Sequence, residues 1–343
     1  MLAFTVRRLL AVPIVLFFVS VIILALMQTL SPEQRAANYL SEQQAARPGA
    51  IRQVIERYGF NRPFYEQYWL WLRGLFRGDL GYSQVSKQPV LTTIRERLPA
   101  SAELTMFAII PVVGLAIWLG TQAALRRNTI FDQATRVLAI VGWSLPTFVF
   151  AIWLLVIFFG GLGWFGVGRI RLDFLTEIAR GNIDTPTGFM TIDALLNGRF
   201  DMFVDALLRL VLPVTTLVVV LGAQIMRVMR SSLLDALTQD YVRTAKAKGL
   251  PKRAVELKHA RRNAIIPVIT LSGIVIAFLL NGQVVIETIF NIRGLGQWFA
   301  LSAVALDVPA VVGFALLTGV IVVVANLLVD LLYAAVDPRI RYS

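Results

Sequence analysis

The feature that most constrains this chain is a set of six long runs without a single charged side chain. Each run approaches or exceeds the roughly 17 to 25 residues that a helix needs to cross about 30 Å of hydrocarbon. The runs are Leu9–Leu30, Leu104–Leu125, Val137–Gly168, Leu210–Met226, Ala264–Ile286 and Val308–Val329. The sequence therefore predicts an all-α integral membrane protein with six transmembrane helices.

Composition and charge agree with a membrane protein. The chain is 57% hydrophobic and 16% charged, whereas soluble domains carry about 25% charged residues. Its net charge of +12 does not indicate nucleic-acid binding, because the basic residues lie between apolar runs and not in one patch with interleaved aromatics. The absence of cysteine excludes disulfides and thiolate metal sites.

The distribution of basic residues predicts the orientation. Arg7 and Arg8 precede the first run and favour a cytoplasmic amino terminus. Segment 227–263, which holds ten Lys or Arg, and the carboxyl terminus then face the cytoplasm as well. We expect three parts: a tail with the first span (1–30), an extracytoplasmic segment with interfacial helices (31–101) and a five-helix core (102–343). The core includes a second extracytoplasmic segment, 169–209.

The extracytoplasmic segments differ in character. In 31–101, apolar residues from Ile51 to Tyr58 recur at helical spacing, and PFYEQYWLWLRGLF indicates an aromatic-rich helix at the membrane interface. Segment 169–209 is acidic and could shape an entrance or only solvate that face. Within the third run, Gly142 and Pro146 predict a kink, because proline removes a backbone donor.

The cytoplasmic segment reads as a helix, a turn and a second helix. The first helix should end at Gly249, and Pro251 suits the first turn of the next. Leu250 and Ala254 then share an apolar face within a basic frame. Such an element could present this face to a soluble partner or rest on anionic lipid, and the residues alone leave both readings open.

We expect no catalytic residue, no metal site and no cofactor bound by this chain. A phosphate-binding P-loop requires Gly before its Lys, and none of the five lysines follows a glycine. The sole histidine, His259, has no second ligand at a suitable spacing. The sequence therefore predicts no ATP hydrolysis by this chain through a P-loop.

Polar residues at and near the spans have two readings. Glu103 and Glu287, near span ends, could contact a substrate or pair with nearby Arg97 or Arg293, and pairing is the favoured reading. Mid-span polar groups could line a pathway or form hydrogen bonds between helices. The pathway candidates are Ser144, Thr147, Thr270, Ser272, Asn281 and Gln283.

The run YVRTAKAKG, followed by HARRNAIIP, resembles the cytoplasmic signature loop of permease subunits of ATP-binding cassette (ABC) importers. The likeness is to the binding-protein-dependent dipeptide, oligopeptide and nickel family. Further stretches that resemble this family cover nearly the whole chain in the right order: GFNRPFYEQYWLWLRGLFRGDLGYS, RERLPASAEL, VVIETIFNIRGLGQWF and NLLVDLLYAAVDPRIRY. Where the family loop often begins Glu-Ala-Ala, this chain has Thr244, Ala245 and Lys246.

The resemblance implies a type I ABC importer permease fold, in which the first span is peripheral and the other five form half of a pseudo-symmetric pore. It implies a prokaryotic inner membrane and four partners besides lipid: a homologous permease, two ATPase subunits that bind ATP and Mg²⁺, and an extracytoplasmic solute-binding protein. Peptides, glutathione-like compounds, nickel complexes and oligosaccharides all fit as cargo. The coupling helix that contacts the ATPase would contain Tyr241, Thr244, Ala245, Ala247, Gly249, Leu250 and Ala254.

The alternative is a self-contained ion-coupled carrier or channel. Ion coupling normally uses intramembrane carboxylates or histidine, and all six apolar runs lack them. The sequence therefore favours an externally powered permease.

Overall fold

A computed structural model describes residues 13–14, 17–22, 24–25, 27–37, 39–40, 42–280 and 283–336. The regular secondary structure of the described residues is helical apart from one short antiparallel ladder, β1 (Tyr82–Ser83) with β2 (Gln88–Pro89). Its internal contacts form two compact units. Unit 1 comprises residues 1–101, 281–288 and 293–324, and unit 2 comprises 102–280, 289–292 and 325–343. The three-part organisation expected from the sequence stays a prediction.

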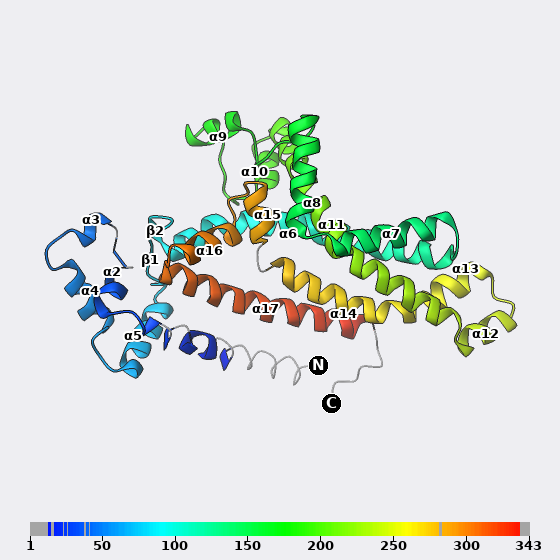
Figure 1. Cartoon of the computed structure of the whole chain (residues 1–343), viewed down its shortest axis with the longest axis horizontal. Helices are drawn as coiled ribbons and strands as arrows, with labels where there is room; N and C mark the ends of the chain where they lie inside the picture. Colours follow the sequence, from blue (N-terminus) through cyan, green and yellow to red (C-terminus); the bar gives the residue numbers. More distant parts are fainter. Residues whose placement is uncertain are drawn as a thin grey trace. The chain divides into compact units, whose positions relative to one another are not determined.

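Short helices make up most of unit 1. They are α2 (Pro32–Ala37), α3 (Glu42–Ala45), α4 (Ala50–Tyr58), α5 (Phe64–Phe76) and α16 (Leu295–Val304), with most of α15 (Val284–Ile289). Helices α4 and α5 confirm the two helices predicted between Ile51 and Phe76. Two long helices, α6 (Val90–Leu125) and α17 (Val308–Val336) (Figure 1), have their first residues in the range of unit 1 and their last residues in the range of unit 2.

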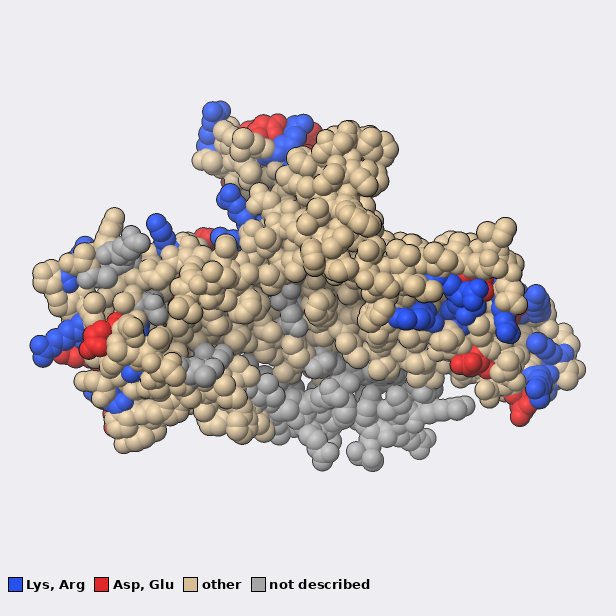
Figure 2. All heavy atoms as spheres, in the orientation of Figure 1, with Lys and Arg blue, Asp and Glu red and all other residues tan. Residues whose placement is uncertain are grey.

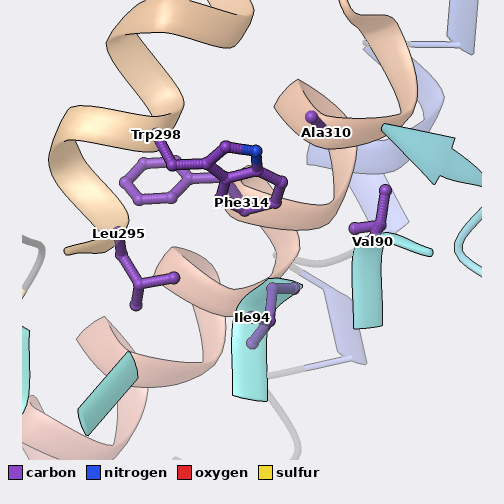
Figure 3. Packing of buried hydrophobic residues seen from close by; sticks show 6 residues of the cluster. All are labelled: Val90, Ile94, Leu295, Trp298, Ala310 and Phe314. Atoms are coloured by element: carbon purple, nitrogen blue, oxygen red, sulfur yellow. The ribbon is translucent and has the colours of Figure 1, made fainter. Parts of the chain in front are cut away.

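The core of unit 1 forms where α6, α16 and α17 meet. Figure 3 shows the indole of Trp298 and the ring of Phe314 lying between Val90 and Leu295. The indole nitrogen donates to Ser83 Oγ over 3.4 Å, and this hydroxyl donates to Asp307 Oδ2 over 2.6 Å. The bonds satisfy polar groups that burial would otherwise leave unpaired, so the ladder is fixed to α16 and α17.

Unit 2 is built around α11 (Phe200–Leu237), a 38-residue helix. It packs against α7 (Ile130–Ser144), α8 (Thr147–Leu154), α10 (Met190–Leu196) and α14 (Arg261–Leu280) (Figure 1). The remaining helices of unit 2 are η1 (Leu155–Gly161), α9 (Leu172–Ala179), α12 (Asp240–Ala247), α13 (Lys252–Ala254) and η2 (Val255–Ala260); η1 and η2 are π-helical.

Four helical stretches among the described residues are long and apolar enough to cross a membrane: Val90–Leu125, Phe200–Leu237, Lys252–Leu280 and Val308–Ala325. A fifth results if α7 and α8–η1 count as one bent span. The first predicted run, Leu9–Leu30, lies partly outside the described residues. The fifth predicted run, Ala264–Ile286, extends beyond the helix that contains it, because α14 ends at Leu280 and α15 begins at Val284.

The kink predicted from Gly142 and Pro146 is confirmed and is sharp. Helix α7 ends at Ser144, Leu145 is extended, and α8 begins after Pro146, so that the two halves differ in direction by 108°. Proline cannot donate the hydrogen bond that would continue α7.

Glycines allow close approach of the long helices in unit 2. A Cβ at Gly120 of α6 would lie 2.6 Å from the carbonyl oxygen of Met226 in α11. A Cβ at Gly142 of α7 would lie 2.7 Å from the carbonyl oxygen of Val219. Small residues at such crossings are characteristic of membrane helix packing.

Segment 169–209 has a core of its own. Phe174 of α9, Ala194 of α10 and Met202 of α11 belong to one buried apolar cluster. The guanidinium groups of Arg171 and Arg199 lie 4.7 and 5.4 Å from the Phe174 ring centroid. The segment is therefore a packed element and not a loose connection.

Candidate functional site

The turn after α12 has the geometry that the sequence predicts. Helix α12 ends at Ala247, and Gly249 adopts a left-handed conformation with φ of +75°. The Gly249 amide donates to Lys246 O over 2.9 Å, and the Leu250 amide donates to Ala245 O over 3.4 Å. Glycine adopts this conformation without the steric cost that a Cβ brings. Pro251 then leads into α13.

One face of α12 is fixed to the rest of unit 2. Val242 is fully buried and Ala245 is 6% exposed, while η2 contributes the buried Val255 and Ala260. Helix α12 packs against η2, and η2 also contacts α11. Only two residues separate α11 from α12, so the element is attached to long helices on both sides.

The other face of α12 and its turn are open. Tyr241 and Leu250 are each 39% exposed, and Thr244, Ala247 and Gly249 are exposed as well. Of the remaining coupling candidates, Ala254 is half-buried, and Ala245 points inward. The small side chain of Ala245 therefore allows close packing within the chain, whereas that of Ala247 lies where another protein could approach.

Basic side chains surround this open face. Figure 2 shows Lys and Arg gathered at the end of unit 2 where Figure 1 places α12. Arg243 pairs with Asp240 over 3.3 Å and Lys252 with Glu256 over 3.8 Å. Three of these four side chains are at least 75% exposed, so the pairs contribute little to stability. The surface presents a small apolar ridge in a positive field.

The pathway candidates differ in burial. Ser144 and Thr147 flank the break between α7 and α8, where Ser144 is exposed and Thr147 is half-buried. On α14, Thr270 is exposed but Ser272 is 6% exposed, so the two face different surroundings. Gln283 is buried in unit 1. Asn281 lies outside the described residues.

Glu103 does not pair with the arginines predicted from the sequence. Glu103 accepts from Arg169 Nη2 over 2.6 Å and from the Thr191 amide and hydroxyl over 2.8 and 2.7 Å. These groups belong to segment 169–209, which folds back onto α6. Proximity in sequence had suggested Arg97 instead, but a buried carboxylate is paired by whatever donors the fold brings to it.

Glu287 is held by hydrogen bonds. It accepts from Ser101 Oγ over 2.7 Å and from the Gln297 and Gln283 amides over 2.9 and 3.3 Å. Burial raises the pKa of this carboxyl, and the hydrogen bonds oppose that rise. Gly294 packs closely on this side chain, because a Cβ there would lie 2.6 Å from the carboxyl carbon. The Glu287 carboxyl thus links α6, α15 and α16.

A second buried ion pair was missed by sequence reasoning. Asp132 is fully buried and receives Arg230 Nε and Nη2 over 2.6 and 2.9 Å. It also accepts the Asn128 amide over 3.0 Å, while Thr129 Oγ1 accepts the Asp132 amide over 3.4 Å. The available signal was the Thr-x-x-Asp pattern, which indicates a helix start at Thr129 but not a partner 98 residues away.

No group of three His, Asp or Glu in the part of the chain that the structure describes could hold a metal ion. The described residues thus form a helical protein with several candidate membrane spans and an exposed basic helical turn.

Comparison with known proteins identifies the family. Residues 113–342 match the family described as binding-protein-dependent transport system inner membrane component, and residues 1–105 match its amino-terminal region. The chain belongs to this family, whose members are non-catalytic permease subunits of ABC importers. The family and the permease role predicted from the sequence are confirmed.

Three relatives illustrate the similarity. The chain is 36% identical over 342 residues to the dipeptide transport system permease protein DppB of Alkalihalophilus pseudofirmus, covering 100% of both chains. It is 40% identical to the probable D,D-dipeptide transport system permease protein DdpB of Escherichia coli K12, and 37% identical to the oligopeptide transport system permease protein AppB of Bacillus subtilis. These two alignments cover 84% of each chain.

Proposed function

We propose that this permease subunit carries dipeptides or short oligopeptides across a prokaryotic inner membrane. The names of the full-length relatives support a peptide cargo. In this proposal a homologous permease supplies the other half of the pathway, an extracytoplasmic binding protein delivers the peptide, and two ATPase subunits bind ATP and Mg²⁺. The six-span topology with both termini in the cytoplasm is part of the proposal, and so is the type I importer fold.

The turn between α12 and η2 is the proposed contact with the ATPase. The observation that carries this assignment is the contrast between its two faces. Val242 and Ala245 fix α12 to the helices behind it, while Tyr241, Ala247 and Leu250 remain open to a partner. A displacement of this element would be passed to α11 and α14, because packed helices shift as rigid bodies. ATP binding and hydrolysis would thereby change which side of the pathway is open.

Substitution of the left-handed glycine tests the coupling role. A Cβ at Gly249 would meet open space, so Gly249→Val should cause no steric clash. The β-branched side chain disfavours the left-handed backbone conformation, however, so the substitution should strain the turn and alter the face offered to the ATPase. We expect ATP-driven uptake of a labelled dipeptide by the reconstituted complex to fall at least tenfold, while membrane insertion persists. Gly181→Val is the matched control, since Gly181 has φ of +77° and open space in the extracytoplasmic segment. Normal uptake by Gly249→Val would refute the coupling role.

Cross-linking tests which face contacts the ATPase. The chain has no cysteine, so Ala247→Cys and Ala245→Cys each introduce one reactive thiol for a benzophenone maleimide. We expect Ala247→Cys to cross-link to the ATPase subunit upon illumination and Ala245→Cys to give far less product, because its side chain is buried. Equal yields from both positions, or none from either in the assembled complex, would contradict the proposed docking face.

A further inference from the structure

A cavity of about 230 Å³ lies in unit 2 among α6, α7 and α11. Arg136 of α7 and both Arg227 and Arg230 of α11 line it, together with apolar residues that include Ile140 and Met226. Figure 2 shows basic side chains gathered over the part of unit 2 where Figure 1 places α7 and α11. None of these residues belongs to the proposed coupling face.

The charge of this cavity is not balanced within the described chain. Asp132 accepts two hydrogen bonds from Arg230. The ion pairs found among the described residues include neither Arg136 nor Arg227, and the Arg227 guanidinium lies 5.4 Å from the Trp143 ring centroid. Three guanidinium groups against one carboxylate leave a net charge of +2, so the cavity is suited to an anion.

The hydroxyl groups that line the cavity already donate to backbone carbonyls, so the guanidinium groups are the main donors to a bound ligand. Thr135 Oγ1 donates to backbone carbonyls of α7, and Ser231 Oγ donates to backbone carbonyls of α11. An anion in the cavity would therefore contact Arg136 and Arg227, whose planar groups match a phosphate.

An apolar cavity borders the basic one, and we refer to the two together as the groove. A second cavity of about 50 Å³ shares Met226 with the first and is lined only by apolar residues of α6, α7 and α11, among them Leu119, Leu138 and Val218. From Met226 to Val218 the groove follows α11 for about 12 Å at 1.5 Å per residue. The outer face of α7 beside it is apolar and exposed, with Val137 at 59% and Ile140 at 62%.

We propose that this groove binds an anionic phospholipid, with its phosphate between Arg136 and Arg227 and one acyl chain along α6 and α11. A free phosphate would use only the basic end, whereas a phospholipid uses both ends. Basic pockets between membrane helices on the cytoplasmic side recognise anionic headgroups in this way. The inference rests on the proposed function only for the cytoplasmic placement of these helix ends.

The test measures phospholipid retained by the assembled transporter. We would titrate the delipidated complex with phosphatidylglycerol or phosphatidylcholine in detergent and count bound molecules by native mass spectrometry. Each arginine near a membrane surface contributes about 1 kcal/mol toward an anionic lipid, which is about fivefold in affinity. Arg136→Gln with Arg227→Gln should therefore weaken phosphatidylglycerol binding about 30-fold. Replacement of both by Lys should retain most of the binding.

Two further variants keep the test specific. Arg127→Gln removes an exposed arginine from the connector that precedes α7 but does not line the cavity, so it should bind phosphatidylglycerol normally. Ile140→Trp adds bulk at an exposed position of the cavity wall without removing charge, and it should also weaken binding.

Several results would overturn the proposal. It is refuted if the double glutamine variant binds phosphatidylglycerol as tightly as Arg127→Gln does, or if the wild-type complex binds phosphatidylcholine as tightly as phosphatidylglycerol. Displacement of phosphatidylglycerol by millimolar inorganic phosphate would indicate a free-anion site instead. A structure of the complex with side chains of the second permease in the groove would assign it to a subunit interface. The readout requires no transport, so loss of peptide uptake would leave this measurement unaffected.

Discussion

The buried pair between Asp132 and Arg230 allows a quantitative prediction about stability. Asp132→Asn keeps the shape of the side chain but removes the charge that compensates Arg230. Breaking a buried ion pair by removing one partner costs about 3–5 kcal/mol. Because the Arg230 side chain is 21% exposed and retains some solvation, we expect a loss near the lower end, about 3 kcal/mol.

Thermal denaturation of the purified complex in detergent measures this loss, with the surviving complex quantified by size-exclusion chromatography. A loss of this size should lower the apparent midpoint by about 5–10 °C. Asp240→Asn is the control, since Asp240 and its partner Arg243 are 94% and 75% exposed, and it should change stability by less than about 0.5 kcal/mol.

A double-mutant cycle then separates the ion pair from other effects of the substitution. Arg230→Gln alone should destabilise the protein through the uncompensated Asp132. The double variant, Asp132→Asn with Arg230→Gln, should recover about 2 kcal/mol or more relative to the sum of the single changes. Additive losses, or a single-variant loss no larger than that of Asp240→Asn, would refute the reasoning.

Two further predictions concern packing and pH. Gly120→Ala should destabilise the protein by about 1–3 kcal/mol, because the added Cβ overpacks against Met226. Gly114→Ala in the same helix is the control: its Cβ meets open space, so it should be neutral or stabilising. The thermal midpoints of the two variants test this difference. Burial, and after it the Asp79 carboxylate, raises the pKa of Tyr58 to about 12. The neutral phenol therefore stabilises the fold fully below about pH 10, and this contribution to stability is lost as the pH rises toward 12. Tyr58→Phe should remove that part of the alkaline loss of stability, and an unchanged alkaline denaturation curve would contradict it.

Local features of this chain could be predicted because they depend on neighbouring residues. The bend after Ser144 follows from Pro146, and the left-handed turn at Gly249 follows from a glycine after a helix and before a proline. Helices α4 and α5 follow from apolar spacing. Each of these depends on rules that act over one or two helical turns.

Long-range pairing could not be predicted in the same way. Glu103 pairs with Arg169, which is 66 residues away in the sequence, and Asp132 pairs with Arg230, which is 98 residues away. The inward position of Ala245 likewise depends on η2, whose packing against α12 does not follow from the residue spacing within either element. Such partners are set by how helices pack, and periodicity within one segment carries no information about them.

The two buried ion pairs lie at the ends of the uncharged stretch of α6. Glu103 and Leu125, the end of α6, are about 33 Å apart along the helix at 1.5 Å per residue, close to the thickness of a bilayer core. Glu103 is neutralised by Arg169 at one end of this stretch, and Asp132 is neutralised by Arg230 just beyond the other. Between them α6 carries no charge, so neither a proton gradient nor a cation has a carboxylate to act upon there. In the proposed coupling, a force applied at the α12 turn would act on helices that pack closely at Gly120 and Gly142 and are joined by these ion pairs, so the helices of unit 2 would shift together.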